Sequence, residues 1–150
     1  MGKLFCLMGK SASGKDTFYS RLSFDKRLGL KNVILYTTRP KRNHEENGKE
    51  YFFVDDKSFE DYTHSGKVIE SRTYETVLGP WHYFTLDDGQ IDLSRSSYII
   101  IGTLESYIRF RDYFGEDYVV PLLINVEDGE RLSRALSRER LQNNPKYAEM

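Results

Sequence analysis

A glycine-rich segment near the N-terminus constrains the fold more than any other part of the chain. Residues 9–17 read GKSASGKDT, and they follow the apolar run Leu4–Met8 and precede a helix-like segment at 17–22. Glycine, four residues and then Gly-Lys is the spacing of the P-loop, a phosphate-binding turn between a strand and a helix. The segment therefore predicts an α/β fold that begins with a strand, a phosphate-binding turn and a helix.

The residues of this turn suit a phosphate group for physical reasons. Its backbone N–H groups point toward one spot, which the positive end of the helix dipole also favours for an anion. Lys15 is a mobile charge that can reach a β- or γ-phosphate. The alternative is a plain turn with a solvated lysine, but the position after an apolar run favours phosphate. The predicted phosphate-binding residues are Gly9, Ser11, Ala12, Ser13, Gly14, Lys15, Asp16 and Thr17.

Asp16 departs from the usual P-loop, which has Ser or Thr directly after the lysine. Here Asp16 comes first and Thr17 second. A carboxylate beside a triphosphate is unfavourable unless a cation lies between them. We therefore expect Mg²⁺ to be bound by Asp16, directly or through water, with help from Thr17. The alternative is that Asp16 only stabilises the start of the helix through its dipole.

Composition limits the possible partners. The chain has 150 residues, enough for one domain with a real core, and its net charge of −1 gives no general attraction to nucleic acid or acidic lipid. An anion site must therefore be local. Cys6 is the single cysteine and lies in an apolar run, so we expect it to be buried and reduced. No run approaches a membrane span and no signal-peptide pattern is visible, so the expected location is cytoplasmic.

Strand and helix signals alternate along the chain, which indicates a largely parallel sheet. Asn47-Gly48 predicts a tight turn before a hairpin or a strand return, and Gly79-Pro80-Trp81 predicts another turn. The polar stretch 86–97 indicates a loop or a poorly defined helix. The predicted strands are 4–8, 32–36, 51–54, 68–74, 98–102 and 119–126, and the predicted helices are 15–22, 55–62, 103–114 and 127–143.

Two further basic segments are candidates for anion binding. Residues 37–42 read TTRPKR, and Pro40 keeps them out of a helix. The alternative for this segment is a solvated basic loop. In the last predicted helix, Arg131, Arg134 and Arg138 share one face at i, i+3 and i+7, although ordinary solvent exposure would also produce that pattern.

Taken together, these motifs resemble the guanylate kinase family of nucleoside monophosphate kinases. The segment 37–42, followed by Glu45, Asn47-Gly48 and Tyr51, is similar to the family signature T-T-R-x-x-R-x-x-E-x-N-G-x-x-Y. Val68-Ile69-Glu70 resembles the next family block, and Tyr83 with Thr85 resembles the one after it. The resemblance extends from Leu4 to about Arg140.

The resemblance implies a P-loop NTPase-type three-layer α/β/α fold with a mainly parallel core sheet. It also implies a small mixed, β-rich acceptor-binding subdomain and a helical lid. The expected organisation is a single domain, 1–150, with its core at about 1–36 and 96–130, its acceptor-binding insert at about 37–95 and its lid at about 131–150. Family members continue past the lid with another strand and helix, which we expect to be missing here.

The implied activity is transfer of the γ-phosphoryl group of ATP to GMP or dGMP, with Mg²⁺. The implied partners are small-molecule nucleotides, with no nucleic acid or membrane, and the chain is expected to be a monomer or a homodimer. The expected catalytic residues are Lys15 and the lid arginines Arg134, Arg138 and Arg140, among which spacing does not choose. The expected acceptor-binding residues are Thr37, Arg39, Arg42, Tyr51, Glu70, Tyr83, Thr85 and Thr103.

The chain departs from the family pattern in the acceptor region. The family's acidic D-x-D motif falls on Ile101-Gly102-Thr103, so a second carboxylate for guanine is absent there. Loss of one charged acceptor costs about 1.5–3 kcal/mol, or roughly ten- to a hundredfold in affinity. Phe84 replaces a glycine, and additional residues lie near Val77–Pro80, so we expect a reshaped acceptor pocket.

These departures leave three alternatives to a guanylate kinase. The first is a kinase of the same family with another acceptor, either a different nucleotide or a phosphorylated sugar. The second is a non-catalytic module that binds phosphorylated peptides, which the intact Gly9, Gly14 and Lys15 disfavour. The third is a P-loop NTPase without an acceptor, which the signature from Arg39 to Tyr51 disfavours.

Overall fold

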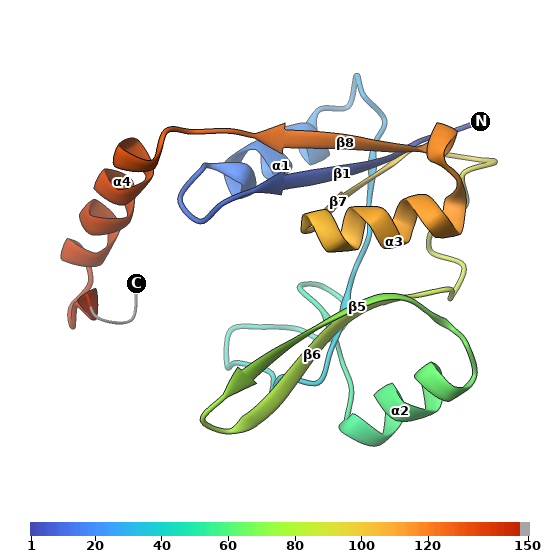
Figure 1. Ribbon diagram of the computed structural model, residues 1–150, viewed down its shortest axis with the longest axis horizontal. Coiled ribbons are helices and arrows are strands. Elements are labelled where there is room, and N and C mark those ends of the chain that lie inside the picture. The colour runs from blue at the N-terminus through green and yellow to red at the C-terminus, as the bar shows by residue number, and fades with distance from the viewer. Residues whose placement is uncertain (148–150) are drawn as a thin grey trace.

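The computed structural model describes residues 1–147 and contains two four-stranded sheets with helices packed around them (Figure 1). The strands are β1 (Leu4–Gly9), β2 (Lys31–Asn32), β3 (Tyr36–Thr37), β4 (Phe52–Phe53), β5 (Val68–Thr76), β6 (Gly79–Leu86), β7 (Tyr98–Ile101) and β8 (Val119–Ile124). The helices are α1 (Lys15–Phe24), α2 (Asp56–His64), α3 (Leu104–Phe114) and α4 (Asp128–Arg140), with a 3₁₀ turn at Glu116–Tyr118.

The first sheet is parallel and has the order β2-β7-β1-β8. Helices α1 and α3 lie on opposite sides of it (Figure 1). Because both faces of a parallel sheet are covered, its central strands are apolar, and Leu4, Cys6 and Leu7 of β1 are all buried, whereas the edge strand β2 consists of two exposed polar residues. The predicted α/β fold with a mainly parallel core sheet is confirmed.

The side of this sheet that faces α3 holds the main apolar core. Phe110 of α3 is fully buried and belongs to one cluster with Cys6 and Ile100. The expected burial of Cys6 is confirmed, and burial raises the pKa of its thiol to about 12. Thr103 caps the start of helix α3, because its hydroxyl accepts a hydrogen bond from the backbone N–H of Ser106.

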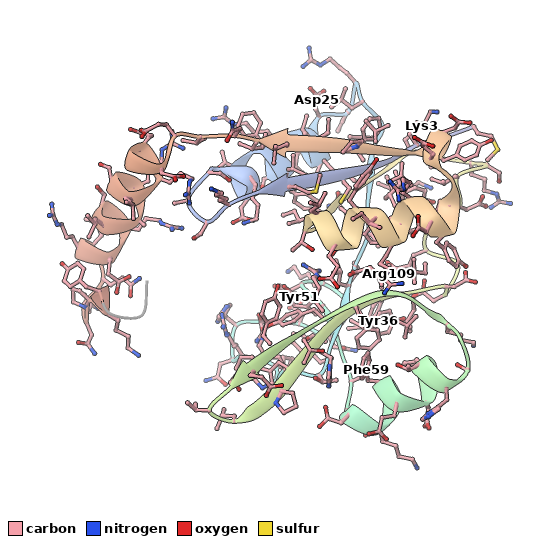
Figure 2. All side chains as sticks on the ribbon, viewed as in Figure 1. Lys3, Asp25, Tyr36, Tyr51, Phe59 and Arg109 are labelled. Atoms are coloured by element: carbon pink, nitrogen blue, oxygen red, sulfur yellow. The ribbon has the colours of Figure 1, made fainter. Side chains whose placement is uncertain are left out.

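The second sheet has the order β4-β3-β6-β5 and is built around the antiparallel hairpin of β5 and β6. Helix α2 packs on one face of it, capped by Asp55, whose carboxylate accepts the N–H of Ser58 at 2.8 Å. Phe84 of β6 is fully buried on that face, and Figure 2 shows Tyr36 and Phe59 in the same region between the hairpin and α2. Aromatic packing therefore gives this sheet a core of its own.

The prediction of one strand at 32–36 is wrong. Asn32 ends β2 in the core sheet, whereas Tyr36 begins β3 in the second sheet, so the residues between them cross from one sheet to the other. The side chain of Gln90 accepts the N–H of Ile34 and donates to its carbonyl, both at 3.0 Å. A side chain thus satisfies the backbone groups that a neighbouring strand would otherwise pair.

One turn prediction needs correction, because the β5–β6 hairpin turns at Val77-Leu78, and Gly79 and Pro80 already belong to β6. After the turn at Asn47-Gly48 the chain returns as strand β4, which runs parallel to β3, so the strand-return alternative is confirmed and the hairpin alternative is not. The stretch 87–97 contains neither helix nor strand, as the loop alternative predicted.

The predicted lid segment begins within α4, and its last three positions, 148–150, lie outside the described residues. No helix within residues 1–147 has the length and apolar character needed to cross a membrane.

Candidate active site

The P-loop connects β1 to α1, as its sequence predicts. Ala12 and Gly14 adopt left-handed conformations with φ of 61° and 87°. At Gly9, an added Cβ would lie 2.5 Å from the Ser13 hydroxyl oxygen and 3.2 Å from the Ile124 carbonyl oxygen. Only glycine fits at position 9 without displacing backbone, and Gly14 meets its positive φ at no steric cost.

Helix α4 places arginines at this loop, although it lies far away in the sequence. The residues from Ala12 to Thr17, together with Arg134 and Arg138, line a cavity of about 320 Å³. Arg131, which the sequence placed on the same helix face but outside the predicted site, donates a hydrogen bond to the Ser11 carbonyl at 3.1 Å. Arg140 does not line this cavity. The geometry thus distinguishes Arg134 and Arg138 from Arg140, which the sequence could not do.

A larger cleft of about 760 Å³ extends from the P-loop to the second sheet. Lys15 and Asp16 line both this cleft and the cavity beneath α4, so the two spaces meet at the start of α1. Tyr51 and Tyr83 line the cleft from the side of the second sheet, with ring centroids 5.6 Å apart. Two regions predicted to bind separate phosphate groups therefore open into one space.

One face of the β5–β6 hairpin is turned toward this cleft. Side chains two residues apart on a strand share a face. On β5 these are Glu70, Arg72, Tyr74 and Thr76, and the register of the hairpin pairs the first three with Thr85, Tyr83 and Trp81 on β6.

Glu70 lies on that face beside the cleft lining, and its side chain is 1% exposed. The Thr85 hydroxyl donates a 3.0 Å hydrogen bond to its Oε1 atom. Burial raises the pKa of Glu70 above its usual range, and the nearby positive charge of Arg72 partly opposes this shift. Glu70 and Thr85 are thus brought together as one hydrogen-bonding unit, as a base-recognition role would require.

The basic segment 37–42 is organised by a residue that the predicted site did not contain. Arg39 is only 5% exposed, and its two terminal nitrogens donate to the Glu45 carboxylate at 2.8 and 3.0 Å. The backbone N–H of Arg42 donates to the same carboxylate at 2.8 Å. These bonds lower the pKa of Glu45 to about 2. Glu45 is part of the family signature, which could have marked it as a site residue, but the spacing of the signature does not show that Arg39 is its partner.

Of the predicted acceptor residues, only Tyr51 and Tyr83 line the cleft. Arg39, Glu70 and Thr85 are buried beside its lining, and the remaining three lie elsewhere. Thr37 is fully buried, and its hydroxyl donates to the His82 carbonyl and accepts the N–H of Arg39. Thr103 caps α3, and the side chain of Arg42 is exposed outside the cleft lining. In this conformation Thr37 and Thr103 support the fold around the site.

Comparison with known proteins identifies the family. A guanylate kinase family model matches residues 1–80, which is more than half of the chain. The chain belongs to the guanylate kinase family.

Individual guanylate kinases are similar over part of their length. The guanylate kinase of Rhodopseudomonas palustris (strain BisB18) is 41% identical over 69 residues, which cover 46% of this chain and 31% of the relative. That of Porphyromonas gingivalis is 35% identical over 86 residues, which cover 57% and 44%. The chain thus spans less than half the length of these curated relatives.

A solved structure extends the similarity in fold. The guanylate kinase of Anaplasma phagocytophilum superposes with a TM-score of 0.65 at 22% identity, over 91% of this chain and 67% of that protein. At this identity the likeness concerns the fold alone. It includes regions beyond residue 80, where the family model no longer matches.

Two departures from the family pattern at the acceptor side have different outcomes in the structure. The expectation that Phe84 reshapes the cleft is wrong, because Phe84 lies on the opposite face of the hairpin, against α2. The strand end at Ile101-Gly102-Thr103 brings no carboxylate, and Ile101 itself lines the cleft. The acceptor side therefore contains Glu70 without a second acid at that strand end.

Asp16 and Thr17 are the residues that would hold Mg²⁺. Among residues 1–147 no cluster of three His, Cys, Asp or Glu side chains could hold a metal by itself. Asp16 and Thr17 nevertheless line the P-loop cavity, and Mg²⁺ commonly uses one or two protein oxygens together with substrate phosphates and water. This donor set fits Mg²⁺ brought in with a nucleotide.

Proposed function

We propose that this chain transfers the γ-phosphoryl group of ATP to GMP or dGMP, yielding ADP and GDP or dGDP. The bond between the γ-phosphorus and the β,γ-bridging oxygen breaks, and a phosphate oxygen of the acceptor forms the new bond to that phosphorus. The observation that carries the proposal is the meeting of the P-loop cavity and the hairpin cleft at Lys15 and Asp16. Phosphoryl transfer mainly requires two anionic substrates to be aligned and their charge to be neutralised.

Each part of the site has a role in this proposal. The loop amides and Lys15 bind the ATP phosphates, and Arg134 and Arg138 stabilise charge on the transferred group from α4. Asp16 and Thr17 hold Mg²⁺, which neutralises phosphate charge when bound. Glu70 and Thr85 bind the base of the acceptor.

Tyr51 and Tyr83, which line the cleft, hold the acceptor phosphate together with Arg42, whose exposed side chain must turn into the cleft to do so. Arg39 is better suited to a positioning role, because its guanidinium is held by Glu45 and lies 5.5 Å from the centre of the Tyr51 ring. The core about 1–36 and 96–130, the acceptor-binding insert about 37–95 and the lid from about 131 are the functional parts of one domain. We place the activity in the cytoplasm, on small-molecule nucleotides, with the chain as a monomer or homodimer.

A second candidate is a kinase with a different acceptor, which the missing second carboxylate supports. A phosphopeptide-binding module is less well supported, because the P-loop retains its phosphate-binding geometry. An assay of ADP formation with ATP and a panel of acceptors separates these functions. The panel should contain GMP, dGMP, AMP, CMP, UMP and phosphorylated sugars.

We expect ADP formation that depends on GMP or dGMP and is abolished by Lys15→Met. Lys26→Met, at an exposed lysine beyond α1, is the matched control and should keep the activity. Turnover with another acceptor alone would replace GMP by that acceptor. Absence of ATP binding and of turnover with every acceptor would reject the kinase assignment.

A further inference from the structure

Arg72 is a cation in the acceptor cleft that the proposed mechanism does not use. It lies two residues after Glu70 on β5, so both side chains are on the same face of the hairpin. Arg72 lines the cleft, and its side chain is 17% exposed. A charged side chain that is mostly removed from solvent normally has a partner or a ligand, so the role of Arg72 has to be explained.

The pair has unused hydrogen-bonding capacity. The Nε atom of Arg72 lies 3.6 Å from Oε2 of Glu70, which makes an ion pair but not a hydrogen bond. In the part of the chain that the structure describes, both of these buried atoms lack a hydrogen-bond partner. Unsatisfied buried polar groups are unfavourable. Arg72 lines the cleft and Glu70 is buried directly beside it, so this donor and acceptor can serve a ligand that enters from the cleft.

A neighbouring acceptor and donor complement the edge of a 6-oxopurine. That edge donates through N1–H and accepts at O6, with a further acceptor at N7. The planar fork of arginine suits O6 and N7, and a carboxylate accepts from the ring N–H. Adenine presents the opposite pattern at the same positions, because its amino group would face the arginine and its N1 lone pair the carboxylate.

We propose that Arg72 is a specificity-determining residue that binds the carbonyl edge of a 6-oxopurine monophosphate while Glu70 accepts its N1–H. The inference rests on the proposed function and deepens it. Arg72 supplies selectivity for the base at a site that has no second carboxylate at the end of β7. Because O6 and N1–H are common to guanine and hypoxanthine, IMP should share the Arg72 contact with GMP.

The main competing role for Arg72 is an additional contact to the acceptor phosphate. Two observations favour the base. Glu70 lies 3.6 Å away and would repel a phosphate dianion brought to Arg72, whereas it attracts a base N–H. Across the hairpin, moreover, Glu70 is paired with Thr85, which already donates to its carboxylate, so the surroundings of Arg72 suit a neutral polar ligand better than an anion.

Isothermal titration calorimetry with GMP, IMP and AMP tests the proposal without depending on turnover. Trp81 is the only tryptophan of the chain and lines the cleft, so its fluorescence provides a second readout. We expect Arg72→Gln to weaken GMP and IMP binding by about ten- to a hundredfold and AMP binding by less than about threefold. Arg72→Lys, which keeps the charge but loses the fork, should lie between Arg72→Gln and the unaltered chain.

Arg95→Gln is the matched control, because Arg95 is an arginine with an 82% exposed side chain that pairs with Asp92 away from the cleft. It should leave all three affinities unchanged. If Arg72→Gln fails to fold by circular dichroism, Arg72→Lys alone decides the question. Equal weakening of GMP, IMP and AMP would assign Arg72 to the phosphate and overturn the proposal, as would no change.

Failure of the proposed function has a different signature. In that case the unaltered chain would bind none of the three monophosphates and would form no ADP with them. Base recognition by Arg72 would then be rejected together with the kinase assignment.

Discussion

Replacement of Phe84 by alanine should destabilise the second sheet more than most single changes in this protein. The Phe84 side chain is fully buried on β6. Its ring centre lies 4.8 Å from that of Phe59, 5.4 Å from that of Tyr36 and 6.3 Å from that of Tyr62. A buried Phe→Ala change typically costs about 3–5 kcal/mol, against a total stability of about 5–15 kcal/mol for a small domain. We expect a loss in that range.

The same change should affect one substrate selectively. Tyr83 and Thr85 flank Phe84 on β6; Tyr83 lines the cleft and Thr85 donates to Glu70, so a loosened β6 misplaces both. The KM for GMP should rise, while the KM for ATP should change little because the P-loop follows a strand of the other sheet.

Urea unfolding followed by circular dichroism measures the stability change, and steady-state kinetics measure the two KM values. Phe24→Ala provides the control, since Phe24 ends α1 and is 83% exposed. An exposed change of this kind should alter stability by less than about 0.5 kcal/mol. A loss below about 1 kcal/mol for Phe84→Ala, or an equal rise in both KM values, would refute the reasoning.

Three further predictions concern charged groups. Arg39 lowers the pKa of Glu45 from its ordinary 4.5 to about 2, so the ionised carboxylate stabilises the fold. The loss of unfolding free energy caused by Glu45→Gln should therefore be largest above pH 4.5 and should vanish as the pH falls toward 2. Urea unfolding at several pH values measures this loss, and a loss that does not change with pH would contradict the ion pair. Arg138→Ala should lower kcat by about ten- to a hundredfold and Arg140→Ala by less than about twofold, and equal losses would contradict the position of α4. Asp16→Asn should raise the Mg²⁺ concentration needed for half-maximal rate. An unchanged requirement would mean that Asp16 does not bind Mg²⁺ and only stabilises the start of α1 through the helix dipole.

Local features of the fold could be predicted from sequence because their signals are contained in a few residues. The P-loop between an apolar strand and a helix is one such feature, and the helix after Asp55 is another. The crossing at 33–35 could not be predicted, since an apolar run reads the same in a strand and in a covered connection. What decides the difference is Gln90, which lies 56 residues from Ile34 in the sequence.

The candidate site was predictable to the extent that it follows a motif. Lys15, Tyr51 and Tyr83 all line the cleft, as their motif positions suggested. The position of Arg72 beside Glu70 follows from the two-residue period of one strand, although no motif marked Arg72 as a site residue. The pairing of Arg39 with Glu45 depends on how the loop between them folds, which no local pattern encodes.

The central claim is that two nucleotide sites meet at Lys15 and Asp16. A bisubstrate compound, with adenosine and guanosine joined by a chain of phosphates long enough to span both sites, tests this most directly by calorimetry. If the sites meet, the compound should bind at least about a hundredfold more tightly than GMP or ATP alone, because binding at one end raises the effective concentration at the other. Binding no tighter than that of the better single nucleotide would contradict the claim.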